Sequence, residues 1–256
     1  MKVRYYTLGC KANQTETDAL KQLFYRQGYP PAAKGETPGI LVVNSCTVTA
    51  AADQKATRLL RKLRREYPAG VLVLTGCLPQ AAQTADRWPE ADIVAGNKDR
   101  RGLVAAVETF LIEQRPVVHL LPHQAGDSYE VAPVSEFRER TRAFIKIEDG
   151  CDHWCSYCII PLARGAVRSR PAEDIFQELE ALAGRGYKEV VITGINLLSF
   201  GKDGGGSLPE LLRQVGRFRG IERIRLGSME PDLVTTELLE TLAGLEAFCP
   251  QFHLWL

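Results

Sequence analysis

The stretch GCDHWCSYC, residues 150–158, places Cys151, Cys155 and Cys158 close together in the spacing C-x-x-x-C-x-x-C. The run AFIKI just before it, residues 143–147, has the apolar character of a buried strand. The three thiols therefore lie on a loop that follows a strand, and α/β folds place their chemistry at the carboxyl ends of strands. We predict that this loop is a functional site in a parallel α/β domain.

Three thiolates on one loop can ligate three irons of a [4Fe-4S] cluster and leave the fourth iron open to a small molecule. A structural zinc site completed by His153 is an alternative. Zinc usually takes four ligands in paired C-x-x-C spacing, and this loop has only one such pair. Unligated thiols are the third possibility, and we favour the cluster over both.

The second half of the chain alternates short apolar runs with helical spacing, which predicts a parallel sheet covered by helices. About four strands fit in this half, whereas a closed or nearly closed parallel barrel needs more. We therefore expect the sequence to be a fragment. The expected strands are 143–147, 189–193, 223–226 and 252–256, and the expected helices are 171–183, 208–218 and 235–245.

The first half shows the same alternation, which predicts a doubly wound parallel sheet. Between residues 115 and 142 the periodicity breaks at several prolines, as in a linker. We predict an N-terminal domain over 1–115, a linker over 116–141 and a second domain over 142–256. The expected strands of the first domain are 3–8, 40–44, 71–75 and 93–95, and its expected helices are 15–27, 50–67, 79–88 and 99–114.

Three further cysteines each follow one of the first three expected strands. Because the carboxyl ends of parallel strands share one edge of a sheet, these thiols are expected to converge and to hold a second cluster. Small residues precede each of them and would let an inorganic group approach the backbone. The alternative is three separate buried cysteines, since free cysteine is often buried. The cysteines are Cys10, Cys46 and Cys77, and the small residues are Gly9, Ser45 and Gly76.

The overall composition excludes several classes of protein. The chain has 256 residues, seven cysteines and a formal net charge of +1. An odd number of cysteines argues against a disulfide framework, and Cys249 has no companion, so we interpret it as a core or incidental residue. Neither a signal peptide nor an apolar run of about 20 residues is evident, so we expect a cytoplasmic protein without a membrane partner.

Together these motifs resemble the radical S-adenosylmethionine methylthiotransferases. The stretch GCDHWCSYCIIPLARGAVRSR, residues 150–170, resembles their cluster-loop signature, and TLGCKANQTETD, NSCTVT and LTGC resemble three blocks of their N-terminal domain. The strings GCKANQ and IIPLARGAVRSR are most similar to the tRNA methylthiotransferases that act on threonylcarbamoyladenosine. Relatives that act on isopentenyladenosine, or on a ribosomal protein aspartate, differ after the first cysteine.

The resemblance implies a fold, two clusters and a reaction. The second domain would be an incomplete radical-SAM (βα) partial barrel. Cys151, Cys155 and Cys158 would hold a radical [4Fe-4S] cluster that binds S-adenosyl-L-methionine. Cys10, Cys46 and Cys77 would hold an auxiliary [4Fe-4S] cluster carrying the sulfur to be inserted. The product would be a methylthio group at C2 of N6-threonylcarbamoyladenosine at position 37, next to the anticodon.

Two segments at later strand ends resemble those with which the family contacts S-adenosylmethionine. TGIN, with Thr193, Gly194 and Asn196, would contact the methionine part, and Ser228 and Glu230 of GSMEP would contact the ribose. A carboxylate that binds a ribose diol is familiar chemistry. Without the resemblance, a solvated loop carboxylate is an equally good interpretation of Glu230.

Nucleic-acid binding would depend on local basic groups. The run on the expected helix 50–67 is best interpreted as a solvated charged face. The arginines just after the cluster loop are expected to contribute to RNA binding, because they would flank the active site beside the aromatic Trp154 and Tyr157. The groups are Arg58, Arg61, Lys62, Arg64 and Arg65 on the helix, Arg138, Arg140 and Arg142 in the linker, and Arg164, Arg168 and Arg170 after the loop.

The resemblance also implies partners. The expected partners are tRNA and an electron donor protein. Binding of tRNA is expected to be weak, because the family's C-terminal RNA-binding β-domain is absent from this sequence. A hypothesis from another class is a truncated fragment that binds clusters but does not turn over.

Overall fold

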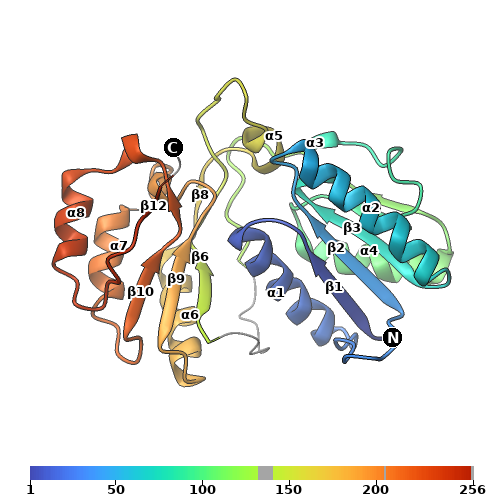
Figure 1. Ribbon diagram of the computed structural model, residues 1–256, viewed down its shortest axis with the longest axis horizontal. Coiled ribbons are helices and arrows are strands. Elements are labelled where there is room, and N and C mark those ends of the chain that lie inside the picture. The colour runs from blue at the N-terminus through green and yellow to red at the C-terminus, as the bar shows by residue number, and fades with distance from the viewer. Residues whose placement is uncertain (132–140, 205, 255–256) are drawn as a thin grey trace. The chain divides into compact units, whose positions relative to one another are not determined.

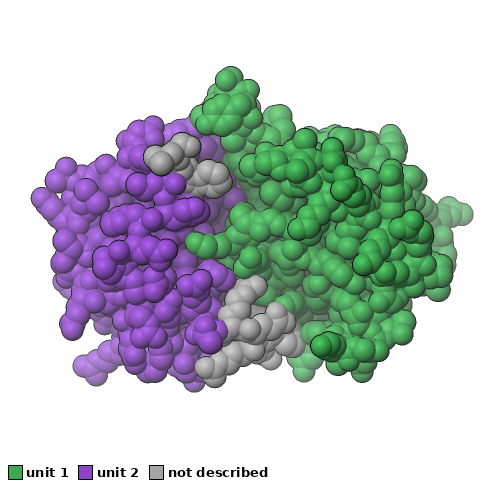
Figure 2. Space-filling view, viewed as in Figure 1, with its two compact units in different colours: residues 1–124, 154–165 green, residues 125–153, 166–256 purple. Residues whose placement is uncertain are grey.

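The computed structural model describes residues 1–131, 141–204 and 206–254. The chain divides into two compact units (Figure 2), and each is described by itself. Unit 1 comprises Met1–Gln124 and Trp154–Gly165, and unit 2 comprises Ala125–His153 and Ala166–Leu256. The division falls inside the cluster loop, so that loop contributes residues to both units. The domain boundaries at residues 115 and 141 stay a prediction.

Unit 1 is built on five parallel strands in the order β1-β2-β3-β4-β5. Figure 1 labels β1, β2 and β3 of this sheet. Every residue of β2 and β3 is buried, because these apolar runs lie in the middle of the sheet with both faces covered. The four predicted strands are confirmed. The strands are β1 (Val3–Thr7), β2 (Ile40–Ser45), β3 (Val71–Gly76), β4 (Ile93–Ala95) and β5 (Val117–His119).

Strand β5 was not predicted and lies in the stretch that the sequence analysis interpreted as a linker. It has three residues, and Val118 is more than half exposed at the edge of the sheet. So short and half-exposed a strand shows no hydrophobic periodicity. Its position is fixed by parallel pairing with β4, which the sequence alone does not reveal.

Helices cover both faces of this sheet, which confirms the doubly wound prediction. Alternate residues of β2 point to opposite faces: Ile40 packs in one hydrophobic cluster with Phe24 of α1, and Leu41 packs in another with Leu60 and Leu63 of α2. The helices are α1 (Lys11–Arg26), α2 (Ala50–Glu66), α3 (Cys77–Ala82) and α4 (Arg100–Glu113).

Helix α3 differs from its predicted range of 79–88. It begins at Cys77, directly after β3, and ends after Ala82, where Gln83 adopts a left-handed conformation with φ of 51°. Such a residue commonly ends a helix. The turn that follows β3 is therefore helical, and Cys77 is the first residue of α3.

Unit 2 contains a three-stranded parallel sheet in the order β10-β9-β6 and two small two-stranded sheets. β7 pairs with β8 antiparallel, and β11 pairs with β12 in parallel. The strands are β6 (Ala143–Lys146), β7 (Glu148–Asp149), β8 (Arg168–Ser169), β9 (Glu189–Thr193), β10 (Arg223–Leu226), β11 (Ser228–Met229) and β12 (His253–Leu254).

The predicted helices of unit 2 are confirmed, and the predicted final strand is confirmed where the structure describes it, as β12. Trp255 and Leu256 lie outside the described residues. A short helix, α5, follows the cluster loop and belongs to unit 1. The remaining elements are α5 (Ile160–Arg164), α6 (Ala172–Gly184), α7 (Leu208–Val215), α8 (Thr236–Ala243) and the 3-10 turns η1 (Leu197–Ser199) and η2 (Pro231–Leu233).

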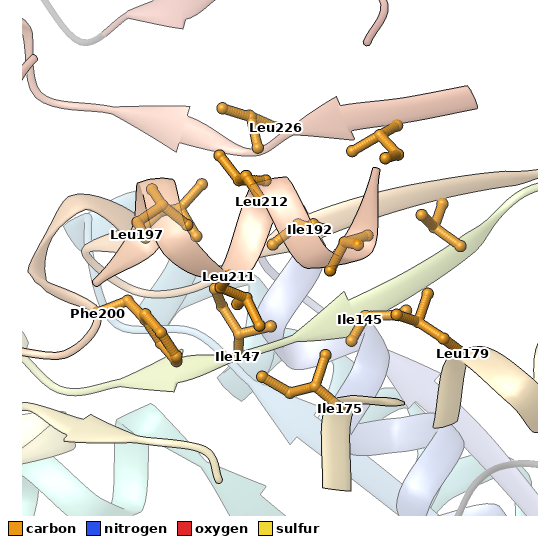
Figure 3. Close-up of a cluster of buried hydrophobic side chains, with 14 of the residues drawn as sticks. Ile145, Ile147, Ile175, Leu179, Ile192, Leu197, Phe200, Leu211, Leu212 and Leu226 are labelled. Atoms are coloured by element: carbon orange, nitrogen blue, oxygen red, sulfur yellow. The ribbon is translucent and has the colours of Figure 1, made fainter. Parts of the chain in front are cut away.

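The core of unit 2 is formed by its parallel sheet and helices (Figure 3). Ile145 and Ile192 come from β6 and β9, and they are buried with Ile175 of α6 and with Leu211 and Leu212 of α7. Branched aliphatic side chains on the strands fill the space beneath the helices, as is typical of α/β layers. This core holds the strand ends that carry the candidate cofactor residues.

None of the helices in the described part of the chain is long and apolar enough to cross a membrane.

Neighbouring leucines on α8 test how this helix packs. Leu238 is 2% exposed and Leu239 is 45% exposed. We expect Leu238→Ala to lower the free energy of unfolding by about 2–5 kcal/mol, because it leaves a cavity in the core. The matched control Leu239→Ala should change it by about 0.5 kcal/mol or less. Urea denaturation of both variants checks this, and equal losses would contradict the packing of α8.

Candidate metal centres

The three N-terminal cysteines lie at one edge of the sheet of unit 1. Cys10 follows β1, Cys46 follows β2 and Cys77 is the first residue of α3, after β3. The thiols of Cys46 and Cys10 both act electrostatically on Cys77, so the three groups lie near one another. Cys46 and Cys77 are buried and Cys10 is exposed. The structure therefore places all three cysteines at the same edge of the sheet, and their convergence on one cluster stays a prediction.

Glycines before Cys10 and Cys77 allow the strand ends to approach closely. Gly9 has φ of +129°, and a Cβ there would lie 2.9 Å from the Cβ of Cys46. Gly76 has φ of +102°, and a Cβ there would lie 2.4 Å from the backbone oxygen of Ser45. A side chain at either position is excluded by strain and by contact. The space that a side chain would occupy is thus filled by Asn13 and Cys46 at Gly9, and by Ser45 and Asn44 at Gly76.

Asn13 joins the first two cysteine loops, and the sequence analysis missed it. The Cys10 thiol donates to its Oδ1 at 3.2 Å, and its Nδ2 donates to the backbone oxygen of Ser45 at 3.1 Å. The side chain is fully buried. Its position three residues after Cys10, in the first turn of α1, is the only sequence signal that would have found it.

The Cys77 thiol lies next to a buried cation. Arg164 Nε donates to its Sγ at 3.2 Å, and Asn97 Nδ2 approaches the same sulfur at 3.9 Å. Burial raises the pKa of the Cys77 thiol to about 11, although the charge of Arg164 opposes this shift. Since a metal binds the thiolate, metal binding at Cys77 must release the proton of the buried thiol.

Arg164 belongs to a buried network of charges within unit 1. Its side chain is fully buried, and both terminal guanidinium nitrogens bond to the carboxylate of Glu16, Nη2 to Oε2 at 3.0 Å. Arg100 Nη2 donates to Oε1 of the same carboxylate at 3.0 Å. Glu16 is thus held between two arginines. The pairing joins residues far apart in the sequence, and no local pattern indicated it.

The prediction that the arginines after the cluster loop contact RNA was wrong. Their side chains are only 0–8% exposed and each forms an ion pair inside the protein. A buried and paired guanidinium does not reach a phosphate in solution. The pairs are Arg164 with Glu16, Arg168 with Asp149 and Arg170 with Glu178.

The basic run on α2 forms ion pairs at the surface, which supports its interpretation as a solvated charged face. Arg61 bonds to Glu90 at 3.0 Å and Arg64 to Asp92 at 2.6 Å. In the linker group, Arg142 pairs with Glu189 at 3.5 Å. Arg138 and Arg140 lie outside the described residues.

In unit 2, Cys151 follows β7 and is buried. The backbone N–H of His153 donates to its Sγ at 3.4 Å, and Asn196 Nδ2 donates to the same sulfur at 3.7 Å. Asn196 was predicted as a cofactor contact, and the structure places it directly on this thiol. The charge of Glu230 also acts on Cys151, so these residues share one site.

The other predicted cofactor residues of unit 2 divide into two groups. Thr193 ends β9 and Gly194 follows it, where a Cβ would lie 2.6 Å from Oε2 of Glu148. Farther along, Glu230 pairs with His153, Oε2 to Nδ1 at 3.3 Å, and Ser228 Oγ bonds to Nδ1 of His253 at 2.8 Å. His153, the candidate fourth zinc ligand, thus contacts a carboxylate.

The remaining thiols of the cluster loop belong to unit 1. Cys155 is exposed and Cys158 is half-buried, and the N–H of Cys158 donates to the backbone oxygen of Cys155 at 2.9 Å. This turn leads directly into α5, which carries Arg164. Cys249 is half-buried in unit 2, and its N–H donates to the backbone oxygen of Ile224 at 2.9 Å.

Across residues 1–131, 141–204 and 206–254, no three Cys, His, Asp or Glu side chains enclose a position for a single metal ion. A [4Fe-4S] cluster makes a different demand, because each of its thiolates binds a different iron. Cysteine thiols in two groups of three along the sequence suit such clusters better than the four paired ligands that zinc usually takes. The role of the six cysteines stays a prediction.

Glu148 is a buried carboxyl that the sequence analysis missed. Its Oε2 accepts the backbone N–H of Asn196 at 2.8 Å, while Oε1 has no hydrogen-bond partner among the described residues. Burial, together with the charge of Asp149, raises the pKa of Glu148 well above its ordinary value. A buried carboxyl with a raised pKa, beside Gly194 and Asn196, is therefore part of the candidate cofactor site.

This raised pKa predicts a pH dependence of stability. The folded chain holds the Glu148 proton more tightly than the unfolded chain. The resulting stabilisation is fully present below the ordinary pKa of 4.5 and is lost as the pH rises through the folded-state pKa. We expect the free energy of unfolding of Glu148→Gln to exceed that of the wild type by a margin that grows as the pH rises above 4.5 towards the raised folded-state pKa. Urea denaturation at several pH values checks this, and a constant difference would contradict it.

Comparison with known proteins identifies relatives of both units. Residues 2–96 match the model described as "Uncharacterized protein family UPF0004". Threonylcarbamoyladenosine tRNA methylthiotransferase MtaB of Bacillus subtilis is 36% identical over 255 residues, which cover 98% of this chain and 56% of the relative. The tRNA-2-methylthio-N(6)-dimethylallyladenosine synthase of Pelotomaculum thermopropionicum is 33% identical over 262 residues, 99% of this chain and 58% of the relative.

A solved structure supports the fold. The radical S-adenosylmethionine methyltransferase TsrM of Kitasatospora setae matches with a TM-score of 0.67 and 16% identity, over 99% of this chain and 58% of that one. The N-terminal parallel sheet followed by a radical-SAM-like partial barrel is thereby confirmed. This chain spans a little more than half the length of the curated relatives. Over almost its whole length the chain is thus similar in sequence to the methylthiotransferases represented by these two relatives.

Proposed function

We propose that this chain is part of an enzyme that inserts a methylthio group at C2 of N6-threonylcarbamoyladenosine at position 37 of tRNA. The observation that carries the proposal is the 36% identity, over 98% of the chain, to a threonylcarbamoyladenosine tRNA methylthiotransferase. The two sets of thiols at strand ends support it, because this chemistry requires two separate clusters.

The proposal assigns two [4Fe-4S] clusters and S-adenosyl-L-methionine to residues already described. The radical cluster would be bound by Cys151, Cys155 and Cys158. The auxiliary cluster would be bound by Cys10, Cys46 and Cys77. When bound, these groups would supply a radical that removes hydrogen from an unactivated C–H bond. A donor protein would provide the electron needed to form that radical. The thiol-only donor sets suit iron–sulfur chemistry.

The chain's own side chains would orient these groups. Asn196 fixes the Cys151 sulfur through Nδ2 and positions the Glu148 carboxyl through its backbone N–H. A protonated Glu148 has a hydrogen-bond donor to offer a cofactor carboxylate. Glu230 would accept hydrogen bonds from the ribose hydroxyls once its ion pair with His153 is broken. Ser228 would accept them once its hydrogen bond with His253 is broken. Thr193 and Gly194 would line the methionine part.

Iron and sulfide content tests the two-cluster proposal. We expect about eight irons and eight sulfides per chain after anaerobic reconstitution, and about four of each in the variant Cys151→Ala/Cys155→Ala/Cys158→Ala. Cys249→Ala is the matched control and should leave the content unchanged. A content of about four irons in the unaltered chain, falling to none in the triple variant, would show that Cys10, Cys46 and Cys77 bind no cluster. Zinc without sulfide would contradict the radical chemistry altogether.

Nucleoside analysis tests the substrate. The reconstituted chain is incubated with S-adenosylmethionine, a reductant and tRNA that carries threonylcarbamoyladenosine or isopentenyladenosine, and digested nucleosides are analysed by mass spectrometry. We expect the methylthio product only from threonylcarbamoyladenosine, and none from the triple cysteine variant. A product from isopentenyladenosine would favour the substrate of the relative from Pelotomaculum thermopropionicum.

Two other outcomes define the alternatives. Modification of an aspartate in ribosomal protein, with both nucleosides unchanged, would move the chain to the protein-modifying relatives. A chain that holds two clusters and cleaves S-adenosylmethionine but modifies neither substrate would support the inactive cluster-binding fragment.

A further inference from the structure

We propose that Arg164 is a positioning residue of the auxiliary site. Its guanidinium holds the Cys77 sulfur by a charge-assisted hydrogen bond and so raises the reduction potential of the cluster that Cys10, Cys46 and Cys77 would bind. This inference rests on the proposed function, because it assumes a cluster on those three thiols. It is argued within unit 1, to which all of these residues belong.

The first step is the geometry of the guanidinium. Both terminal nitrogens of Arg164 are engaged by the carboxylate of Glu16, in the paired arrangement that suits a planar guanidinium. This pairing fixes the plane and rotation of the group. The third nitrogen, Nε, is then directed at Cys77 Sγ at 3.2 Å. Glu16 therefore acts as the support that aims Arg164 at the sulfur.

The second step is the charge. Arg164 and Arg100 carry +1 each and Glu16 carries −1, so the charges of these three side chains sum to +1. Each of the three side chains is at most 8% exposed. Buried charges are costly unless they are paired, and Glu16 pairs with both arginines. The positive charge of Arg164 is therefore held in place beside the Cys77 sulfur.

The third step is the effect on a cluster. The potential of an iron–sulfur cluster is set by cluster type, net charge, hydrogen bonds to the sulfurs and solvent exposure. Reduction adds a negative charge, which a cation and donor at a ligand sulfur stabilise. Arg164 supplies both at one atom of Cys77. The reduced form should therefore be favoured by Arg164.

A purely structural role for Arg164 is the competing explanation. Helix α5 is also tied to its surroundings by Asn97, whose Nδ2 donates to the backbone oxygen of Ala163 at 2.8 Å. A residue that only fastened α5 would alter stability when replaced. It would not move the potential of a cluster that still formed.

The test isolates the auxiliary cluster and removes the hydrogen bond at constant charge. In the Cys151→Ala/Cys155→Ala/Cys158→Ala background, Glu16→Gln/Arg164→Met leaves only the charge of Arg100, so the network remains at +1. The midpoint potential is measured by a redox titration followed by electron paramagnetic resonance. We expect the reduction equilibrium to shift at least tenfold toward the oxidised form, about 59 mV for one electron.

The matched control makes the same chemical change at an exposed ion pair. Arg213 and Glu237 pair at 3.0 Å with side-chain exposures of 47% and 60%, and Arg213→Met/Glu237→Gln should leave the potential unchanged. A cluster that forms in the test variant with the parent's potential would overturn the inference and leave the proposed function intact. A background chain without iron and sulfide would refute the auxiliary site itself, and the inference with it.

A second measurement needs no change at Arg164, in case the variant does not fold. The background chain is labelled with ¹⁵N-arginine, and the reduced cluster is examined by pulsed electron paramagnetic resonance. We expect a ¹⁵N coupling from the guanidinium nitrogen that donates to Cys77, and Arg164→Lys should abolish it. Absence of any arginine coupling in the unaltered background would overturn the inference.

Discussion

Parallel pairing of β1, β2 and β3 is the constraint on which the chemistry of unit 1 depends. Because the strands run in one direction, all three end at the same edge, and cysteines from distant parts of the sequence meet there. The register leaves little freedom, since Gly9 and Gly76 allow adjoining strand ends to touch. A side chain at either glycine would displace a thiol and with it the whole arrangement.

The two sets of thiols differ in how the protein holds them. Cys77 is buried and contacts a cation, Cys10 is exposed and bonds to an amide, and Cys151 is fixed by a backbone N–H and by Asn196. Cys155 lies in an exposed turn. A buried sulfur with a cationic neighbour favours electron storage, whereas an exposed turn favours access to small molecules. Each set thus combines a buried thiol with an exposed one.

The longer strands, and the positions of cysteines just after them, could be predicted because their signals are local: apolar runs and the residues that follow them. The buried charges could not. Glu16 and Arg164 meet across 148 positions, and Glu148 looks like any strand carboxylate until the fold buries it. The error with the arginines after the cluster loop has the same origin, since a sequence gives the sign of a charge but not its exposure. Strand β5 was missed because three residues carry no periodicity.

Helix α5 has a consequence for the modularity of this fold. Although it follows the cluster loop in sequence, it packs as part of unit 1 and supplies the guanidinium that pairs with Glu16. The first 124 residues expressed alone would therefore contain a buried carboxylate without one of its two arginines, a costly arrangement. A chimaera that exchanges the N-terminal sheet between relatives would need to transfer residues 154–165 with it. Unit 1 is discontinuous in sequence, so a single boundary placed along the chain would cut through it.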